Sequence, residues 1–501
     1  MRGFSLIELL IALAILSTTL VAVSLVAFGT PGMLERGRQE VRAGALAEAI
    51  LAQQTGLAQT DFPSIVPLAT STETGGFSTA LSIETLPDTF TKRLTASVSF
   101  SIPFQGTRTV SLPLLITDPK AALGSDPCSS TLAGDWTHPT ASTHSFSAGS
   151  LLPATFSAGS RSIASLFAFQ NMLAVTLDPA AGKTDPTLYL FLIPSTSHIP
   201  SYIGSIDNAP TTKDGFAALA YDPPYLFAAN AHAADWSSCK EGTACSQLQV
   251  IDISNPSNPV LARSYALAST SAPYALGSGG QSTGKSLAYR DGYLYVGLTK
   301  SSAALGQEFV ILDVHDPIHP QLRGGFSVGR TVNHITLAWP YAYLATDDNT
   351  RELIVLDVKD PAAPTLVRSW NAPGSTSFGY GRDVALWNGF TYFARSYVSN
   401  APELYTLDQN LAPLSSIDIG TALFPRSAVA LRLRDQLLTV LTSSEVQWYT
   451  PGATGALSPA ALSIPLPTGT TGAALTCSGN YLYVAGNEAN GNGTITVLTG
   501  S

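Results

Sequence analysis

A repeated pattern of short strands is the feature that most restricts the fold of this sequence. Its clearest copy runs SLAYRDGYLYVGL at residues 286–298 and then FVILDVHDPIHPQL at residues 309–322. Six other copies have the same order of strands, and they begin near residues 163, 219, 335, 384, 428 and 474. Those at 219 and 335 are also clear, and the copy near 163 is the first in the chain. Units of about 45 to 70 residues with four short strands each are typical of a β-propeller, whose blades close into a ring. The sequence therefore predicts an all-β, seven-bladed β-propeller over residues 150–501.

The end of the chain predicts how this ring closes. The last copy ends with GTITVLTGS at residues 493–501 and lacks the proline-rich fourth strand of the other copies. A closed ring leaves only short, protected strand edges, so another segment must supply that strand. We expect LLPATFSAG, residues 151–159, to complete the seventh blade.

The corners of the repeat carry a family resemblance. IDISNPSNP at residues 251–259 and LDVKDPAAP at residues 356–364 resemble the LVIVD repeat family. The resemblance covers residues 150–501, and it implies the same propeller fold.

The first residues impose a second constraint. Residues 4–28 contain one ionisable side chain, Glu8. At 1.5 Å per residue, a helix of this length crosses a hydrocarbon core of about 30 Å. A carboxylate in that core costs about 2.5 to 3.5 kcal/mol, so Glu8 needs a partner, and an amine is the candidate.

Gly3, Phe4 and Glu8 lie in the motif RGFSLIE, which resembles the N-terminal signal of type IV pilins and pseudopilins. The resemblance implies that residues 1–3 are a leader, that prepilin peptidase cuts after Gly3, and that Phe4 is then methylated. It also implies that Glu8 pairs with the α-amino group of a neighbouring subunit during assembly. An ordinary secretory signal fits poorly because its apolar core is shorter and is not interrupted by a carboxylate. A simple N-terminal anchor remains the alternative.

A long helix over residues 4–59 is expected to pack on a small antiparallel sheet over residues 80–118. In the helix, the apolar stripe comprises Leu34, Val41, Ala45 and Ala49, with Leu46, Ile50 and Leu57 beside it. In the sheet, two alternating runs at residues 94–102 and 107–116 predict a hairpin.

This helix and sheet give residues 4–118 the α+β architecture that the pilin resemblance implies. The Pro-, Ser- and Thr-rich residues 119–149 show little periodicity, and we expect them to form a linker to the propeller.

Composition bears on partners and cysteines. A net charge of −9 without a basic stripe argues against nucleic acid binding. The N-terminal signal places most of the chain outside the cytoplasm, where disulfides persist. We expect Cys239 and Cys245, which flank a short polar loop, to pair. Cys128 and Cys477 then either pair with each other or remain buried thiols.

Neither catalysis nor a bound metal or cofactor is expected. The sequence contains no GxSxG, HExxH, Walker or EF-hand pattern. His315 and His319 are too few for a zinc site, and Asp347, Asp348 and Asn349 predict a solvated turn. One aspartate ends the third strand in each clear copy, and we expect its carboxylate to accept amides of the following turn; these are Asp252, Asp313 and Asp357.

One set of polar residues remains as a candidate binding face. Aligning the repeats on their second strands places six of them in two adjacent registers: Lys285, Asn333 and Arg382, then Ser286, His334 and Asp383. Both registers fall where the inner strand begins, near the centre of the ring. A repeat that keeps its core and varies one rim is typical of a binding face; the alternative is that these side chains are simply solvated.

These features predict a pilin-like filament subunit that displays a propeller for adhesion or another surface interaction. Its expected partners are copies of itself, prepilin peptidase, the pilus or secretion assembly machinery, the membrane before assembly, and an unidentified surface ligand. The precursor is expected in the cytoplasmic (inner) membrane and the mature subunit in an extracellular filament, or fimbrium, at the cell surface. One alternative is a pseudopilin or minor tip pilin of a secretion or uptake machine, with the propeller binding cargo. The other is a tethered surface enzyme, which no catalytic motif supports.

Overall fold

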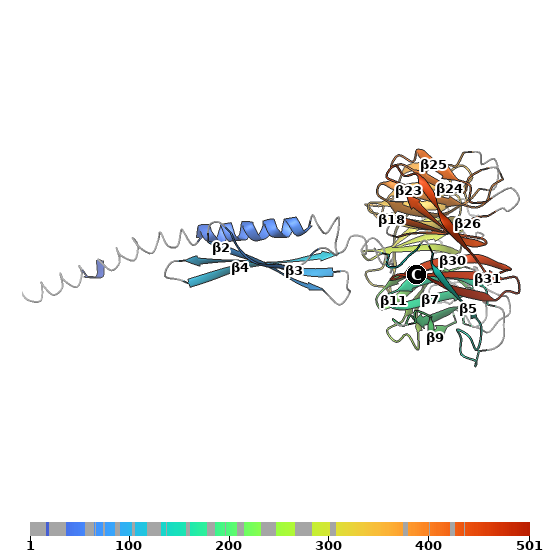
Figure 1. Cartoon of the computed structure of the whole chain (residues 1–501), viewed down its shortest axis with the longest axis horizontal. Coiled ribbons are helices and arrows are strands. Elements are labelled where there is room, and N and C mark those ends of the chain that lie inside the picture. Colours follow the sequence, from blue (N-terminus) through green and yellow to red (C-terminus); the bar gives the residue numbers. More distant parts are fainter. Residues whose placement is uncertain are drawn as a thin grey trace, which may run out of the picture. The chain divides into compact units, whose positions relative to one another are not determined.

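A computed structural model divides the chain into two compact units, Met1–Ala122 and Leu123–Ser501 (Figure 1). It describes residues 17–19, 37–55, 65, 67–73, 76–85, 91–102, 106–117, 132–136, 138–156, 161–177, 186–195, 197–207, 215–231, 247–265, 283–300, 307–373, 379–399, 401–420, 426–434 and 436–501. Among these residues, no helix has the length and apolar character needed to cross a bilayer. Most of the expected membrane helix lies outside the described residues.

The first unit contains a helix at residues 37–55 and a four-stranded antiparallel sheet. Its strands lie side by side in chain order: β1 (Leu68–Glu73), β2 (Phe77–Thr85), β3 (Thr91–Ile102) and β4 (Gly106–Thr117). β3 and β4 pair along their whole length, which confirms the predicted hairpin. The sheet begins earlier than the expected residue 80, because β1 and the start of β2 were not recognised. Gly106 begins β4 with a φ of 81°, a conformation that only glycine adopts without strain.

The helix buries a different stripe from the one expected. Ala43, Ala47 and Leu51 are buried, whereas Val41 is 75% exposed, and Ala45 and Ala49 are also exposed. The buried residues recur every four positions and pack on one face of the sheet, against residues such as Leu81, Leu94, Ala96, Val98 and Phe100. Small alanines at the contact let the helix lie close to the sheet. Leu46 and Ile50 flank this stripe and are partly buried, as expected.

The described part of the second unit forms seven four-stranded antiparallel sheets, here called blades. From the inner to the outer strand, the first two are β6 (Ile163–Phe169), β7 (Met172–Leu177), β8 (Leu188–Leu192) and β9 (Ser201–Ile206), then β10 (Phe216–Asp222), β11 (Tyr225–Asn230), β12 (Leu248–Asp252) and β13 (Val260–Tyr265). The next two are β14 (Gly284–Arg290), β15 (Tyr293–Leu298), β16 (Phe309–Asp313) and β17 (Gln321–Phe326), then β18 (Val332–Ala338), β19 (Tyr341–Thr346), β20 (Leu353–Asp357) and β21 (Thr365–Trp370). The last three are β22 (Gly381–Trp387), β23 (Phe390–Arg395), β24 (Leu404–Leu407) and β25 (Pro413–Ile417), then β26 (Ala428–Arg434), β27 (Leu437–Thr442), β28 (Glu445–Pro451) and β29 (Leu457–Pro465), then β30 (Thr470–Ser478), β31 (Tyr481–Glu488), β32 (Gly493–Thr499) and β5 (Thr140–Phe146).

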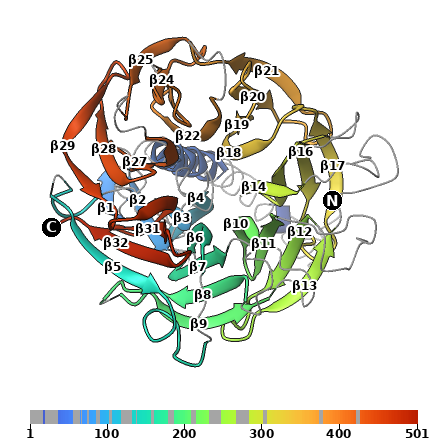
Figure 2. The same cartoon turned by 90° about the vertical axis from the view of Figure 1, so that its right-hand side faces the viewer.

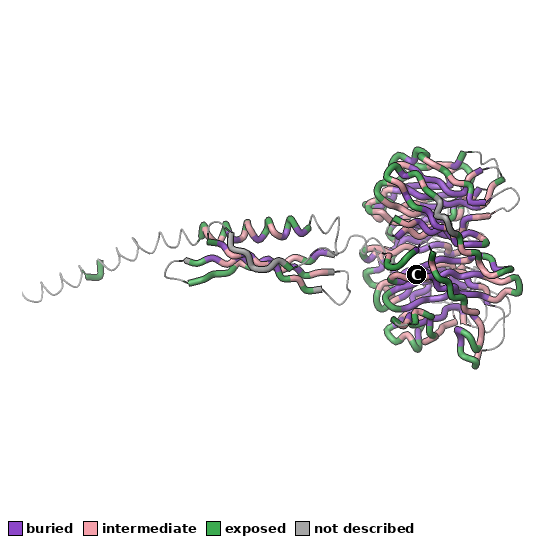
Figure 3. The backbone as a smooth tube through the Cα atoms, in the orientation of Figure 1, coloured by how far each residue is buried: buried purple, intermediate pink, exposed green. Residues whose placement is uncertain are grey.

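The blades are arranged in a propeller-like ring (Figure 2). The first strand of each blade lies near the axis and contacts the first strands of the two neighbouring blades, from β6 round to β30 and back to β6. Each of these inner strands buries one aliphatic side chain at its centre: Leu166, Leu219, Leu287, Ile335, Val384, Leu431 and Leu475. Apolar clusters then fill the space between neighbouring blades, so the core is a set of interblade layers rather than one central mass. Buried residues accordingly occur along strands throughout the second unit (Figure 3).

The ring closes through a different segment from the one expected. The outer strand beside β32 is β5, which pairs with it from Phe146–Gly493 to Thr140–Thr499. The expected segment, residues 151–159, instead places Leu151 and Leu152 in the apolar cluster between the first and last blades. β5 is polar and mostly exposed, as an outer strand is, so it lacks the alternation that identifies a half-buried strand. It also lies inside residues 119–149, so the last part of the expected linker belongs to the second unit.

Candidate functional site

Every inner strand carries a β-bulge near its start. The pairing register with the second strand shifts at the second residue in six blades and at the fourth residue in β30, so one residue in each blade lies opposite no partner. These seven residues, here called the bulge row, are Ala164, Ala217, Lys285, Asn333, Arg382, Val429 and Ala473. The register that the sequence predicts for Lys285, Asn333 and Arg382 is therefore confirmed, and its physical basis is the bulge.

The bulge row is accessible to solvent on every blade. Arg382 is exposed and the other six residues are partly exposed, although the residue before each bulge is buried. The row surrounds the ring axis, where the inner strands begin (Figure 2). Its polar residues occupy three consecutive blades, and the other four blades carry Ala or Val. One sector of the row is therefore polar and cationic, and the opposite sector is apolar.

The register after the bulge holds the blades together. Ser286 Oγ donates to Val332 O of the next inner strand at 2.9 Å. His334 Nδ1 lies 2.8 Å from Asp383 Oδ1, and Asp383 Oδ2 accepts the Leu431 amide at 2.7 Å. Burial alone would raise the pKa of Asp383, but His334, Arg432 and the Leu431 amide together lower it. These contacts link four consecutive inner strands, β14, β18, β22 and β26.

The six candidate residues therefore divide by role. Ser286, His334 and Asp383 form interblade contacts, and Asn333 Nδ2 also donates to Gly381 O of the next blade, at 2.9 Å. The expectation that all six form a binding face is thus wrong for Ser286 and Asp383, which are buried. Lys285 and Arg382 remain as the charged residues of the row.

A row of buried glutamates was not recognised from the sequence. Glu308, Glu352, Glu403 and Glu445 occupy the same position in four consecutive blades, at or just before the start of the third strand. In three of them, Oε2 accepts the amide of the residue two positions after the fourth strand: Val328 at 3.0 Å, Ala372 at 3.3 Å and Ile419 at 3.1 Å. The signal was present, because QEFVILD, RELIVLD, PELYTLD and SEVQWYT align with the glutamate in one column.

Glu352 forms an interblade ion pair with Arg395. Both side chains are fully buried, and Arg395 Nη2 lies 3.0 Å from Glu352 Oε1. Burial raises the pKa of Glu352 while Arg395 lowers it, and the net direction is upward. Gly379 lies against the pair, since a Cβ atom there would clash with both Arg395 Nη2 and Glu352 Oε1. The two opposite charges compensate each other, but among the described residues neither Glu352 Oε1 nor the guanidinium nitrogens of Arg395 have a well-aligned hydrogen-bond partner.

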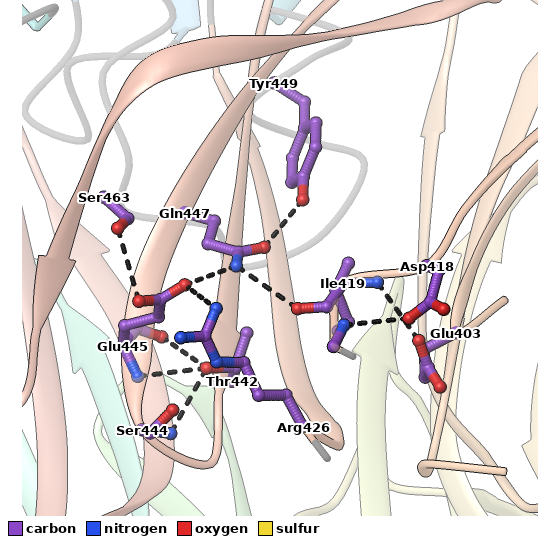
Figure 4. Close-up of polar contacts among 11 residues, drawn as sticks. Glu403, Asp418, Ile419, Arg426, Thr442, Ser444, Glu445, Gln447, Tyr449 and Ser463 are labelled. Carbon is purple, nitrogen blue, oxygen red and sulfur yellow. Dashed lines mark hydrogen bonds and ion pairs between the residues drawn. The ribbon is translucent and has the colours of Figure 1, made fainter. Parts of the chain in front are cut away.

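Glu403 lies beside a second carboxylate, Asp418 (Figure 4). Burial raises the pKa of Glu403 to about 7; the Ile419 amide opposes this shift, and the negative charge of Asp418 adds to it. Among the described residues, Glu403 Oε1 has no hydrogen-bond partner. Two ionised carboxylates have no proton to share, so a hydrogen bond between them requires one to be protonated.

In the next blade, both carboxylate oxygens of Glu445 accept hydrogen bonds from side chains, unlike those of Glu403 (Figure 4). Its Oε1 accepts Arg426 Nη1 and Gln447 Nε2, each at 2.5 Å, and its Oε2 accepts Ser463 Oγ at 3.3 Å. Gln447 Oε1 accepts the Tyr449 hydroxyl at 2.6 Å. Burial and the charge of Glu445 raise the pKa of Tyr449 to about 12. The same repeat position thus carries a carboxylate that is ion-paired with an arginine in one blade, Glu445, and one beside a second carboxylate in the neighbouring blade, Glu403.

The strand-end aspartates are structural, as expected. Asp252, Asp313 and Asp357 each accept the amide two residues later, at 2.8, 3.1 and 2.9 Å. The side chains of His315 and His319 contact Asp313 and Asp316 at 2.8 Å. Among the described residues, no three His, Cys, Asp or Glu side chains come together as metal ligands would.

The predicted N-terminal site and most cysteines cannot be placed. Gly3, Phe4 and Glu8 lie outside the described residues, as do Cys128, Cys239 and Cys245. Cys477 is fully buried and disulfide-bonded, which excludes the free-thiol alternative for this residue. Its pairing with Cys128 stays a prediction.

Comparisons with known proteins identify two sequence families in the chain. Residues 1–24 match the prokaryotic N-terminal methylation motif, and residues 244–266, 329–372 and 473–490 match the LVIVD repeat. No curated protein is similar enough in sequence to be matched.

Solved propellers resemble the chain only distantly. A candidate 6-phosphogluconolactonase from Bacteroides fragilis aligns with a TM-score of 0.47 and 10% identity, over 76% of this chain and 92% of its own. The periplasmic gluconolactonase PpgL of Pseudomonas aeruginosa aligns with a TM-score of 0.45 and 11% identity, over 67% of this chain and 96% of its own. The WD40 β-propeller domain of Doa1 aligns with a TM-score of 0.45 and 12% identity, over 72% of this chain and 97% of its own. Similarities this weak say nothing about activity. The chain thus joins a prokaryotic N-terminal methylation motif to LVIVD repeats in an all-β, propeller-like unit.

Proposed function

We propose that this protein is a type IV pilin-like subunit of an extracellular filament, which displays a β-propeller for adhesion or another surface interaction. The methylation motif at residues 1–24 carries the proposal, since it indicates pilin-like processing. In this proposal, residues 4–118 form a pilin-like module, and seven blades close the propeller. The precursor is held in the membrane, and the mature protein is a structural subunit without enzymatic activity.

Leader cleavage gives the first test. Replacing Gly3 with Trp should leave residues 1–3 uncut, because the peptidase site would no longer hold a glycine. Intact-mass spectrometry of the purified subunit reads the outcome directly, together with the methyl group expected on Phe4. Normal cleavage of Gly3→Trp would contradict the proposal, and Ser5→Ala is the matched control that should still be processed.

Filament growth gives the second test. Replacing Glu8 with Gln removes the charge proposed to neutralise the α-amino group of a neighbouring subunit, so insertion should persist while filaments are reduced at least tenfold. Electron microscopy of sheared surface fractions measures this. Filaments at the normal level in the Glu8→Gln strain would remove the basis for the assembly role.

The size of the second unit favours a variant of this function, a minor or tip subunit of a pilus or secretion pseudopilus. The unit spans Leu123–Ser501 and is much larger than the first. A large domain on every subunit of a helical filament crowds its neighbours, whereas one at the tip does not. Subunit stoichiometry in purified filaments distinguishes the two arrangements.

A further inference from the structure

We propose that the polar sector of the bulge row binds a carboxylate group of the propeller's ligand, with Arg382 as its main contact. The inference rests on the proposed function of the propeller as a displayed binding domain, and it specifies the chemistry of the ligand.

Arg382 differs from the other charged side chains near the axis. Among the described residues it donates no hydrogen bond and forms no ion pair, although it is exposed at the start of β22. Surrounding protein lowers its pKa, while Tyr380 and Asp347 act in the opposite direction. A guanidinium that is partly enclosed and forms no ion pair keeps its N–H groups available to bind an anion.

Two of the neighbouring carboxylates, Asp383 and Asp348, already have cationic partners, and the third, Asp347, accepts the Thr331 amide at 2.7 Å. Asp383, the next residue, contacts His334 and Arg432 and accepts the Leu431 amide. Asp348 is paired with Arg351 at 3.1 Å. The interblade contacts therefore hold the backbone of β22 in place without using the side chain of Arg382.

The sector also provides a cationic and polar surrounding. Lys285 and Asn333 occupy the same register on the two preceding inner strands, and these strands contact one another in sequence. The four remaining positions of the row are Ala or Val and offer no charge. The cationic side chains of the row therefore lie within three consecutive blades on one side of the ring, which would orient an anionic ligand at the axis.

The number of charges favours a carboxylate over a phosphate. One guanidinium fork matches one planar carboxylate with two parallel hydrogen bonds. A doubly charged phosphate requires more donors, and the nearby Asp347 disfavours a second negative charge. Acidic sugars of surface polysaccharides carry such a carboxylate on an otherwise neutral ring.

Binding of sodium glucuronate to the full-length chain, measured by calorimetry at low ionic strength, tests the proposal. We expect saturable binding in the millimolar range, no binding of glucose, weaker binding of inorganic phosphate, and at least a tenfold loss in Arg382→Gln. Arg108→Gln, an exposed arginine of β4, is the matched control and should bind normally.

Two results would overturn the inference: equal affinity of the Arg382→Gln variant, or phosphate binding as tight as glucuronate binding. Filament formation by Arg382→Gln is measured in parallel. Filaments without glucuronate binding by the parent chain would refute the inference alone, whereas the loss of filaments in the Glu8→Gln strain tests the proposed function separately.

Discussion

Replacing Glu403 with Gln should change how the stability of the second unit depends on pH. The ordinary pKa of a glutamate is 4.5, and burial raises that of Glu403 to about 7. Because the folded-state pKa is raised, the folded protein retains a proton between these values that the unfolded chain releases. The contribution to stability is complete below pH 4.5 and is lost as the pH rises through 7.

The size of the effect follows from the shift. One pKa unit corresponds to about 1.4 kcal/mol, so the shift sets an upper limit of about 3 kcal/mol. We expect about 1 to 2 kcal/mol after local relaxation and screening. Gln keeps the shape, accepts the Ile419 amide and offers Asp418 an N–H donor. The variant should therefore be more stable than the parent by this amount at pH 8, and nearly equal to it at pH 4.5.

Tryptophan fluorescence provides the assay. All six tryptophans lie at or beyond residue 136, so denaturant unfolding of the full-length chain in detergent, followed by fluorescence, reports on the second unit alone. Unfolding is measured at pH 4.5, 6 and 8 for the parent and for Glu403→Gln.

Glu308 is the matched control because it occupies the same repeat position. Its Oε2 accepts the amides of Val328 at 3.0 Å and Gly329 at 2.8 Å. Replacing it with Gln weakens two hydrogen bonds to a charged group, so it should cost about 1 kcal/mol or more at pH 8. A Glu403→Gln variant that is no more stable than the parent at pH 8 would refute the reasoning.

Two further predictions concern the ring. Arg395→Met should lower the free energy of unfolding by about 3 to 5 kcal/mol because it leaves Glu352 buried without its counter-charge. Adding Glu352→Gln should recover part of this loss of stability. An unchanged unfolding midpoint for Arg395→Met would contradict the ion pair. Replacing Ser142 and Thr143 of β5 together with proline should cost about 3 kcal/mol, since successive amides alternate in direction and one of the two faces β32. Fluorescence-detected thermal unfolding measures both, and a normal midpoint for the proline variant would show that β5 does not stabilise the ring.

The repeats were predictable because their strands obey local rules. Alternating aliphatic and tyrosine residues mark the first two strands, and an aspartate followed by a proline-rich corner marks the end of the third. The corner has a further role that local rules do not show. A Cβ atom on Gly324 of β17 would lie 2.4 Å from Pro361 O in the corner of the next blade, so the outer strand and this corner pack in direct contact.

The segments that were mispredicted depend on tertiary contacts. β5 is an exposed outer strand with the sequence TASTHSF, and only its pairing with the chain end makes it a strand. In the helix at 37–55, both possible stripes contain small apolar residues, and the sheet selects Ala43 and Ala47 over Ala45 and Ala49. Sequence periodicity alone does not distinguish two such faces.

The candidate binding face illustrates the same limit and narrows the search for a ligand. Polar residues that vary from blade to blade fit a binding rim, yet Ser286 and Asp383 vary because each interblade contact is chemically different. The bulge row has no ladder partner on its second strand, and it is solvent-accessible in every blade. A substitution at the charged row position Arg382 would therefore change what the ring presents without altering the contacts described between blades. It follows that ligand specificity should depend on Arg382 of the bulge row, whereas stability should depend on the register beside the row and on Asn333, which donates to the next blade.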